Sequence, residues 1–134
     1  MPNSLDLLAI LTAGLVSGAL GGLWYSPKML GPAWMAALGK SEAELQLGGG
    51  EMAGSIVSCL VAAAAVEFLV TACGVDTALG GAGIGALLGV GVVAMTMLSD
   101  SLFSGWGWKL YFIQVGYRAT YLVIMGAICG GWPW

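Results

Sequence analysis

The strongest constraint on this chain is that it holds four apolar runs, each about as long as a lipid bilayer is thick. A helix needs about 20 mostly apolar residues to cross a hydrocarbon core of roughly 30 Å. The runs occupy residues 5–25, 52–73, 78–98 and 110–131. Peptide groups cannot be hydrated inside lipid, so each run is predicted to satisfy its own by forming a helix. The sequence therefore predicts an all-α integral membrane protein, with four transmembrane helices in a single domain over residues 1–134.

The longest polar stretch, residues 26–51, is too short to bury a core of its own and is predicted to lie at the membrane surface. Its segment Pro32–Leu38 opens with a proline that favours a helix start and places Trp34 with other apolar side chains on one side. We therefore expect a short interfacial helix between the first and second runs. Ser41–Glu44 has the form of a capping box, and Gly48–Gly50 follows as a predicted hinge.

The sparse charges and ligand-type residues exclude several functional classes. Four Lys and Arg against seven Asp and Glu leave no basic surface for nucleic acid. With no histidine and three scattered cysteines, the sequence predicts no metal site and no cofactor. No nucleophile with a neighbouring base is visible, so we do not expect an enzyme. Cys73 and Cys129 lie near run ends predicted to share a membrane face, where they either form a disulfide or fill space as small apolar residues.

Positive charges lie on one side of the predicted bilayer. Lys28, Lys40 and Lys109 belong to the first and third connections, while the termini and the second connection carry no Lys or Arg. The positive-inside rule then places both termini outside the cytoplasm. The tryptophans agree with an aromatic belt at both surfaces, with Trp24, Trp34, Trp106 and Trp108 at the inner one and Trp132 and Trp134 at the outer one.

Glycines repeat at the spacing that suits helix packing. In lipid, helices associate through close backbone approach, which small residues permit. Glycine recurs at every fourth position on three runs, at Gly14, Gly18 and Gly22, at Gly81, Gly85 and Gly89, and at Gly126 and Gly130. These seams predict tight packing, either within the chain or between copies in a homo-oligomer. An alternative for the third run is that Gly80, Gly81 and Gly83 unwind the helix to line a cavity, as in transporters.

Two charges, Glu67 and Arg118, fall deep inside the predicted runs. A charge at membrane depth needs a partner, a cavity or a reach to the interface. One helix face carries Tyr111, Gln114, Arg118 and Tyr121, and another carries Ala63, Glu67 and Thr71. We expect the polar members of both faces to line one binding site for a small solute or ion, where Glu67 and Arg118 interact directly or through water. Alternatively, Arg118 snorkels to the inner interface and Glu67 is protonated and bonded to a neighbouring helix.

Two motifs resemble a bacterial membrane family, the domain-of-unknown-function family numbered 1761. The first is Gly22-Leu-Trp-Tyr-Ser-Pro27, followed by Gly31 and Trp34. The second is Trp108-Lys-Leu-Tyr-Phe-Ile-Gln-Val-Gly-Tyr117, followed by Met125-Gly-Ala-Ile128. Their order and spacing match the family over essentially the whole chain. The resemblance implies a small four-helix protein of the bacterial inner membrane and carries over no activity. Arg118 departs from the uncharged or weakly basic residue expected at its position.

Both motifs belong to the predicted inner face, so we expect them to meet there as a polar and aromatic cluster. The candidate members are Trp24, Tyr25, Ser26, Pro27, Trp34, Asp100, Lys109 and Tyr117. Such a cluster is either structural or a binding site for a lipid headgroup or small anion. Asp100 and Lys109 either pair across the third connection or serve as solvated anchors.

Three functions fit these features. The first is a small oligomeric transporter or channel-like protein for a small solute or ion, which requires a hydrated path. The second is a membrane scaffold or accessory subunit that binds other helices through the glycine seams. The third is a lipid-binding protein. In each case the expected partners are membrane lipid and further copies of the chain, together with a small solute, ion or lipid as ligand.

Overall fold

The computed structural model describes residues 5–41 and 49–133, and within these ranges the secondary structure is helical. Its elements are α1 (Leu7–Trp24), α2 (Gly31–Leu38), α3 (Gly49–Ala72), α4 (Ala78–Ala86), the π-helix η1 (Leu87–Ala94), α5 (Met95–Ser104) and α6 (Trp108–Gly130). The elements α4, η1 and α5 form one unbroken helix of 27 residues. Together with α1, α3 and α6 it makes four helices long and apolar enough to cross a membrane, as the sequence predicts.

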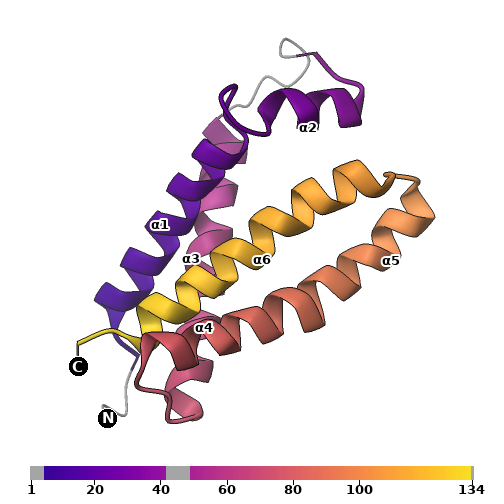
Figure 1. Ribbon diagram of the computed structural model, residues 1–134. Coiled ribbons are helices and arrows are strands. Elements are labelled where there is room, and N and C mark those ends of the chain that lie inside the picture. Colours follow the sequence, from indigo (N-terminus) through magenta and orange to yellow (C-terminus); the bar gives the residue numbers. More distant parts are fainter. Residues whose placement is uncertain (1–4, 42–48, 134) are drawn as a thin grey trace.

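The last helix, α6, is the centre of the structure. It contacts α4 along most of that element and also packs against α1, α3, η1 and α2 (Figure 1). The helices α1 and α3 pack against each other, while α5 diverges from α6. The start of α1 and the end of α6 lie at one end of the molecule, and α2 lies at the other (Figure 1). Because successive long helices run in opposite directions, Lys28, Lys40 and Lys109 lie at the end opposite to the start of α1.

Local side chains and glycines set the helix ends. The Asp6 carboxylate accepts the N–H groups of Leu8 and Ala9, at 2.9 and 3.1 Å, and so caps the first turn of α1. The Thr77 hydroxyl caps α4 in the same way, accepting the N–H of Gly80 at 3.0 Å. Gly105 ends α5 with a φ of 68°, a left-handed conformation that favours glycine.

Two boundaries differ from the sequence prediction. The third long helix continues to Ser104 rather than ending at Leu98, because the polar residues after Leu98 do not break a helix and the first residue that does is Gly105. The predicted hinge at Gly48–Gly50 is wrong for its described part, since Gly49 and Gly50 form the first turn of α3. The predicted short helix between the first and second runs is present as α2. Most of the predicted capping box lies in residues 42–48, outside the described ranges.

The third long helix is not unwound at its glycines. Gly80, Gly81 and Gly83 all lie in the regular helix α4, so the cavity-lining alternative for them is wrong. The irregularity comes later, as the π-helix Leu87–Ala94. The Tyr111 hydroxyl of α6 donates to the Ala94 carbonyl at 2.7 Å, which satisfies a backbone acceptor at the end of this π-helical segment.

Glycine brings the α4 and α6 backbones into direct contact. A Cβ added at Gly81 would overlap the carbonyl oxygen of Gly126, and one at Gly126 would overlap that of Gly81. Two further glycines of the same contact have similarly little room, namely Gly85 against Leu122 and Gly130 against Thr77, and Gly89 of η1 lies close to Ala119. Side chains larger than hydrogen would therefore separate α4 from α6.

The glycines of α1 have different surroundings. A Cβ at Gly14 would meet the Leu60 side chain at 2.7 Å, so this glycine lies in the contact with α3. Gly18 and Gly22 have no described atom within 4 Å of such a Cβ. The seam on α1 is therefore only partly covered within one copy of the chain.

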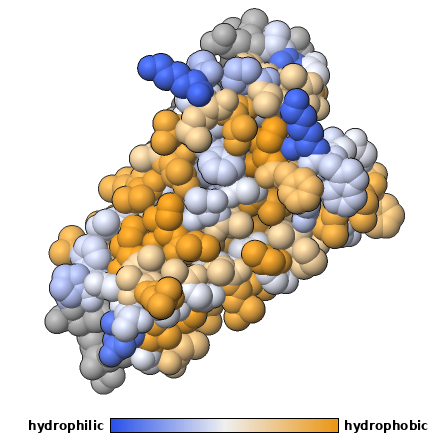
Figure 2. Space-filling model, viewed as in Figure 1, coloured by the Kyte–Doolittle hydropathy of each residue, from blue (hydrophilic) through white to orange (hydrophobic). Residues whose placement is uncertain are grey.

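The outer surface is largely apolar. Hydrophobic residues cover most of the middle of the face shown in Figure 2, and hydrophilic ones gather toward its ends. Large apolar side chains on this surface include Phe103, which is 93% exposed, and Leu79, which is 85% exposed. Water would penalise such a surface, whereas lipid would not.

We predict that Gly81→Ala destabilises the fold whereas Gly83→Ala does not. Both replacements raise the helix propensity of α4 equally, but only the first places a methyl group against the Gly126 carbonyl, since Gly83 has open space around it. Overpacking of this kind lowers the free energy of unfolding by about 1–3 kcal/mol. Unfolding in detergent followed by circular dichroism measures the difference, and equal stability of the two variants would contradict the close contact.

Candidate anion-binding site

Glu67 and Arg118 do not share a site. The Glu67 carboxylate accepts the Asp6 N–H at 3.4 Å and lies beside Cys129 of α6. Arg118 precedes Cys129 by 11 residues on the same helix, which is roughly 16 Å along the helix axis. The common interior space predicted from the sequence is therefore wrong. The sequence predicts how far along its own helix each residue lies. It does not predict how far α3 is shifted along α6, because that shift is set by the packing of the two helices.

Five aromatic rings gather where α1 ends. The ring of Tyr117 lies 5.5 Å from Tyr25, 6.4 Å from Trp24 and 4.9 Å from Tyr121, centroid to centroid. Tyr25 in turn lies 4.7 Å from Trp34 of α2. The rings of the two sequence motifs thus meet, although the first motif contacts the middle of α6 rather than its start.

Two hydrogen bonds fasten the end of α1 to α6. The Trp24 indole N–H donates to the Ile113 carbonyl at 3.1 Å, and the buried Tyr117 hydroxyl donates to the Ser17 carbonyl at 2.9 Å. Both bonds join a side chain of one helix to the backbone of the other. They fix the height at which α1 ends beside α6.

A tight turn folds α2 back over the rings. The N–H groups of Leu30 and Gly31 donate to the carbonyls of Trp24 and Ser26, both at 3.0 Å. Gly31 is required here, because a Cβ would lie 2.5 Å from the carbonyl oxygen of Tyr25. The turn places Trp34 on Tyr25 and leaves the cluster half-buried under α2.

Arg118 contributes a half-buried positive charge to this cluster. Its guanidinium donates to the Gln114 carbonyl at 3.0 Å, one turn earlier on α6. Burial raises the pKa of the Tyr25 hydroxyl, and the neighbouring Arg118 partly opposes this rise. Tyr25 is therefore a neutral phenol at physiological pH. Within residues 5–41 and 49–133, Arg118 forms no ion pair.

Two more hydrogen-bond donors of the cluster lack an acceptor. The Ser26 hydroxyl and the Trp34 indole N–H are both buried, and neither has a hydrogen-bond partner. Buried polar groups are usually paired, because an unmade bond costs about 1–3 kcal/mol. Together with the free N–H groups of Arg118, these donors suit a ligand that supplies only acceptors, such as a phosphate or a carboxylate.

Other predicted site residues lie elsewhere. Asp100, Lys109 and Pro27 are exposed and lie outside the ring cluster, and Asp100 and Lys109 form no ion pair within the described ranges. Tyr111 packs in a second ring group with Trp108 and Phe112. The polar stripe of α6 is thus divided, with Gln114, Arg118 and Tyr121 at the aromatic cluster and Tyr111 at the π-helix.

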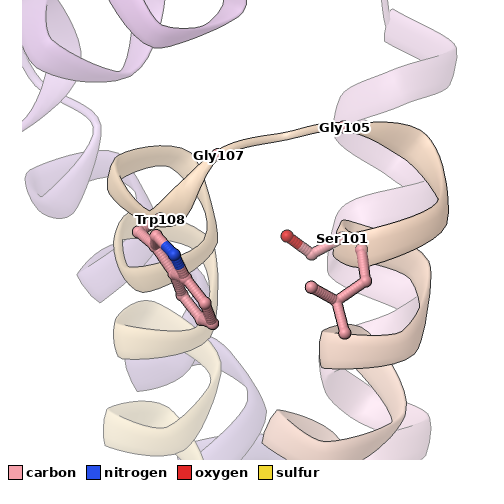
Figure 3. A pocket seen from close by; sticks show the side chains of 5 residues that line it. Ser101, Gly105, Gly107 and Trp108 are labelled. Atoms are coloured by element: carbon pink, nitrogen blue, oxygen red, sulfur yellow. The ribbon is translucent and has the colours of Figure 1, made fainter.

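A pocket of about 330 Å³ lies between the end of α5 and the start of α6. Ser101 and Trp108 face each other across it, below the turn that contains Gly105 and Gly107 (Figure 3). Ser101 was not predicted as a site residue, because a serine in a helix followed by glycines has no specific signature in the sequence. The lining offers one buried hydroxyl and no charged side chain, so it supplies less binding chemistry than the Arg118 cluster.

The cysteines contribute neither a bridge nor a metal site. Cys59, Cys73 and Cys129 are all free, with Cys73 exposed and the other two buried, so the disulfide alternative is not realised. Within the described ranges, no three His, Cys, Asp or Glu side chains lie close enough to hold a metal ion.

These features define a class of protein, namely a small all-helical chain with four helices of membrane-spanning length and an arginine-containing aromatic cluster at one end. A family model described as "Protein of unknown function (DUF1761)" matches residues 8–130. The chain therefore belongs to this family, which confirms the resemblance seen in the sequence. Comparisons with curated proteins and with solved structures gave no match.

We predict that Trp24→Phe lowers the free energy of unfolding by about 1 kcal/mol, because it removes the bond to the Ile113 carbonyl while keeping an aromatic ring. The control is Trp108→Phe, since Trp108 is 60% exposed and should change stability by less than about 0.5 kcal/mol. Thermal unfolding in detergent compares them. An equal effect at both positions would show that the indole bond does not stabilise the α1–α6 contact.

Proposed function

We propose that this chain is a multi-pass protein of a bacterial inner membrane that binds the phosphate of an anionic lipid headgroup at the Arg118 cluster. The four apolar helices and the apolar surface support insertion into lipid. The lysines at the end opposite to the termini support an orientation with both termini outside the cytoplasm.

The proposed ligand rests on one observation, which is that the cluster contains hydrogen-bond donors that have no acceptor. Arg118, Ser26 and Trp34 offer guanidinium, hydroxyl and indole hydrogens. A phosphate oxygen accepts several such bonds at once, and charge-assisted bonds from arginine are the strongest of them. This favours an anion over a neutral or cationic ligand.

The surroundings favour a lipid as the source of that phosphate. Leu23, which precedes the cluster, is 55% exposed, and Met29 in the turn is 45% exposed. These apolar side chains flank the donors at the end of a membrane-length helix, the depth at which headgroups meet acyl chains. A lipid would satisfy the donors and cover the exposed apolar surface together.

Transport of a small solute is less well supported by this geometry. The expected path depended on a space shared by Glu67 and Arg118, whereas Glu67 lies beside Cys129, which is roughly 16 Å from Arg118 along α6. Direct backbone contact between α4 and α6 also fills the centre of that hairpin. We therefore propose a binding role, without catalysis, rather than a path for solute.

A second candidate role is self-association, favoured by a groove between α1 and α3. The groove measures about 220 Å³ and is lined by Gly14, Leu15, Gly18, Ala19, Met52, Ser55 and Ile56. Gly18 has no described atom near it within one copy. A helix of a second copy fits such a groove of small residues, because small side chains permit close backbone approach.

We predict that Arg118→Gln weakens binding of phosphatidylglycerol by about 10- to 100-fold, the effect of losing a charge-assisted bond of about 1.5–3 kcal/mol. Binding is measured by native mass spectrometry and by quenching of tryptophan fluorescence with a brominated phosphatidylglycerol. Lys109→Gln is the matched control, since it removes the same charge from an exposed position of α6.

Two further ligands in the same binding experiment identify the source of the anion. Phosphatidylcholine tests whether the net charge of the headgroup is needed, and inorganic phosphate tests whether a soluble anion competes. Stronger binding of inorganic phosphate than of lipid would make the ligand a soluble anion. Equal effects of Arg118→Gln and Lys109→Gln would refute the site.

For self-association, we predict that Gly18→Leu reduces energy transfer between labelled copies in proteoliposomes at least severalfold, because the side chain fills the groove. Folding of the single copy should be unaffected, since Gly18 has open space. Gly83→Leu, at an exposed position outside the groove, is the control and should leave energy transfer unchanged. Unchanged energy transfer in Gly18→Leu would exclude this groove as the interface.

A further inference from the structure

Glu67 is a fully buried carboxyl group at the end of the molecule opposite to the Arg118 cluster. Its side chain is 0% exposed, and Val66 and Val70 of the same helix are buried beside it in the sequence. One carboxylate oxygen, Oε1, accepts the Asp6 N–H at 3.4 Å, where α1 begins. The other oxygen, Oε2, is buried and has no hydrogen-bond partner.

A second unpartnered oxygen belongs to the same helix face. Thr71 follows Glu67 by one helical turn, and its Oγ1 is also buried without a partner. Residues four apart on a helix lie one above the other, so the two oxygen atoms face the same interior region. A carboxylate oxygen and a hydroxyl oxygen left unpaired on one face of a helix suit a single positively charged ligand held between them.

Neighbouring groups do not balance the charge of Glu67. The titratable groups closest to it are Asp6, at the start of α1, and the Cys129 thiol of α6. Asp6 is itself acidic and caps the positive end of the α1 dipole, while a thiol is only a weak donor. In the part of the chain that the structure describes, no Lys or Arg pairs with Glu67.

We propose that Glu67 Oε2 and Thr71 Oγ1 form a binding site for one small monovalent cation, either a proton or a sodium ion. A proton on Oε2 would neutralise the carboxyl group and turn this unpaired acceptor into a donor. A sodium ion would take both oxygen atoms as ligands, in keeping with the preference of hard cations for oxygen. Either occupant removes the cost of an isolated carboxylate in the core.

The site also couples cation binding to the position of α1. Because Oε1 accepts the Asp6 N–H, the carboxyl group joins α3 to the beginning of α1. Loss of the cation would leave a bare charge in the core and favour hydration, which opens the α1–α3 contact at this end. Cation binding therefore stabilises the closed arrangement. This inference concerns a different end of the molecule from the lipid site and does not depend on it.

The test compares wild type with Glu67→Gln, which keeps the shape of the side chain and removes its charge. Thermal unfolding in nanodiscs is followed from mildly acidic to mildly alkaline pH, in sodium chloride and in choline chloride at equal ionic strength. Since only the folded state holds the cation in this site, stability should fall as the pH rises in choline chloride. The folding equilibrium should fall by up to about tenfold for each tenfold loss of protons.

The two occupants give different results. If the site takes sodium, added sodium chloride restores the stability lost at high pH, and if it takes only a proton, the two salts behave alike. Glu67→Gln should abolish the part of the stability change with pH or with sodium that comes from this site. Glu51→Gln, which neutralises an exposed glutamate of the same helix, should leave that part intact.

A response in Glu67→Gln equal to that of the wild type would overturn the proposal. Thr71→Val provides a second variant should Glu67→Gln fail to fold, because it removes Oγ1 while keeping the shape of the side chain. It should weaken cation binding and shift the stability profile to lower pH or to higher sodium concentration. An unshifted profile in Thr71→Val would equally contradict a site built from both oxygen atoms.

Discussion

Direct contact between the backbones of α4 and α6 is the constraint on which the rest of the structure depends. Lipid provides no hydrophobic force between helices, so attraction must come from close packing over a long contact. The pair Gly81 and Gly126 provides the closest approach, with each glycine against the carbonyl of the other. This contact fixes α6 along one side, and α1 and α3 pack around the remainder of its surface.

Once α6 is fixed, its polar side chains decide where the other helices lie. Tyr117 and Trp24 bind α1 at its end through backbone carbonyls, and Tyr111 binds the end of the π-helix. Each of these bonds satisfies a polar group that lipid would leave unpaired. The same bonds bring Arg118 under the turn between α1 and α2, so the donor-rich cluster is a consequence of how α1 is held.

The sequence predicts what lipid thickness and local chemistry determine. Four helices follow from run length, α2 follows from Pro32, and the buried face of α3 is correct, since Ala63 and Glu67 are both 0% exposed. The site was predicted only in part, because the offset between α3 and α6 is a property of packing and separates Glu67 from Arg118. The π-helix was missed, since its i→i+5 bonding has no residue signature comparable to a cap or a proline.

The Arg118 cluster and the Glu67 region, which lie at opposite ends of α1, differ in chemistry because of how the helices pack. Tight glycine contacts leave no room for hydrated polar groups along the middle of the α4–α6 hairpin, so polar atoms that lack partners occur where other helices begin or end. Ser26 and Trp34, whose polar side-chain atoms lack partners, lie after the end of α1, and Glu67, with one unpartnered carboxylate oxygen, lies where α1 begins. The Trp34 indole can only donate and a carboxylate can only accept, which is why the ligands proposed for the two ends carry opposite charges. A single helix, α1, therefore begins beside one proposed site and ends beside the other.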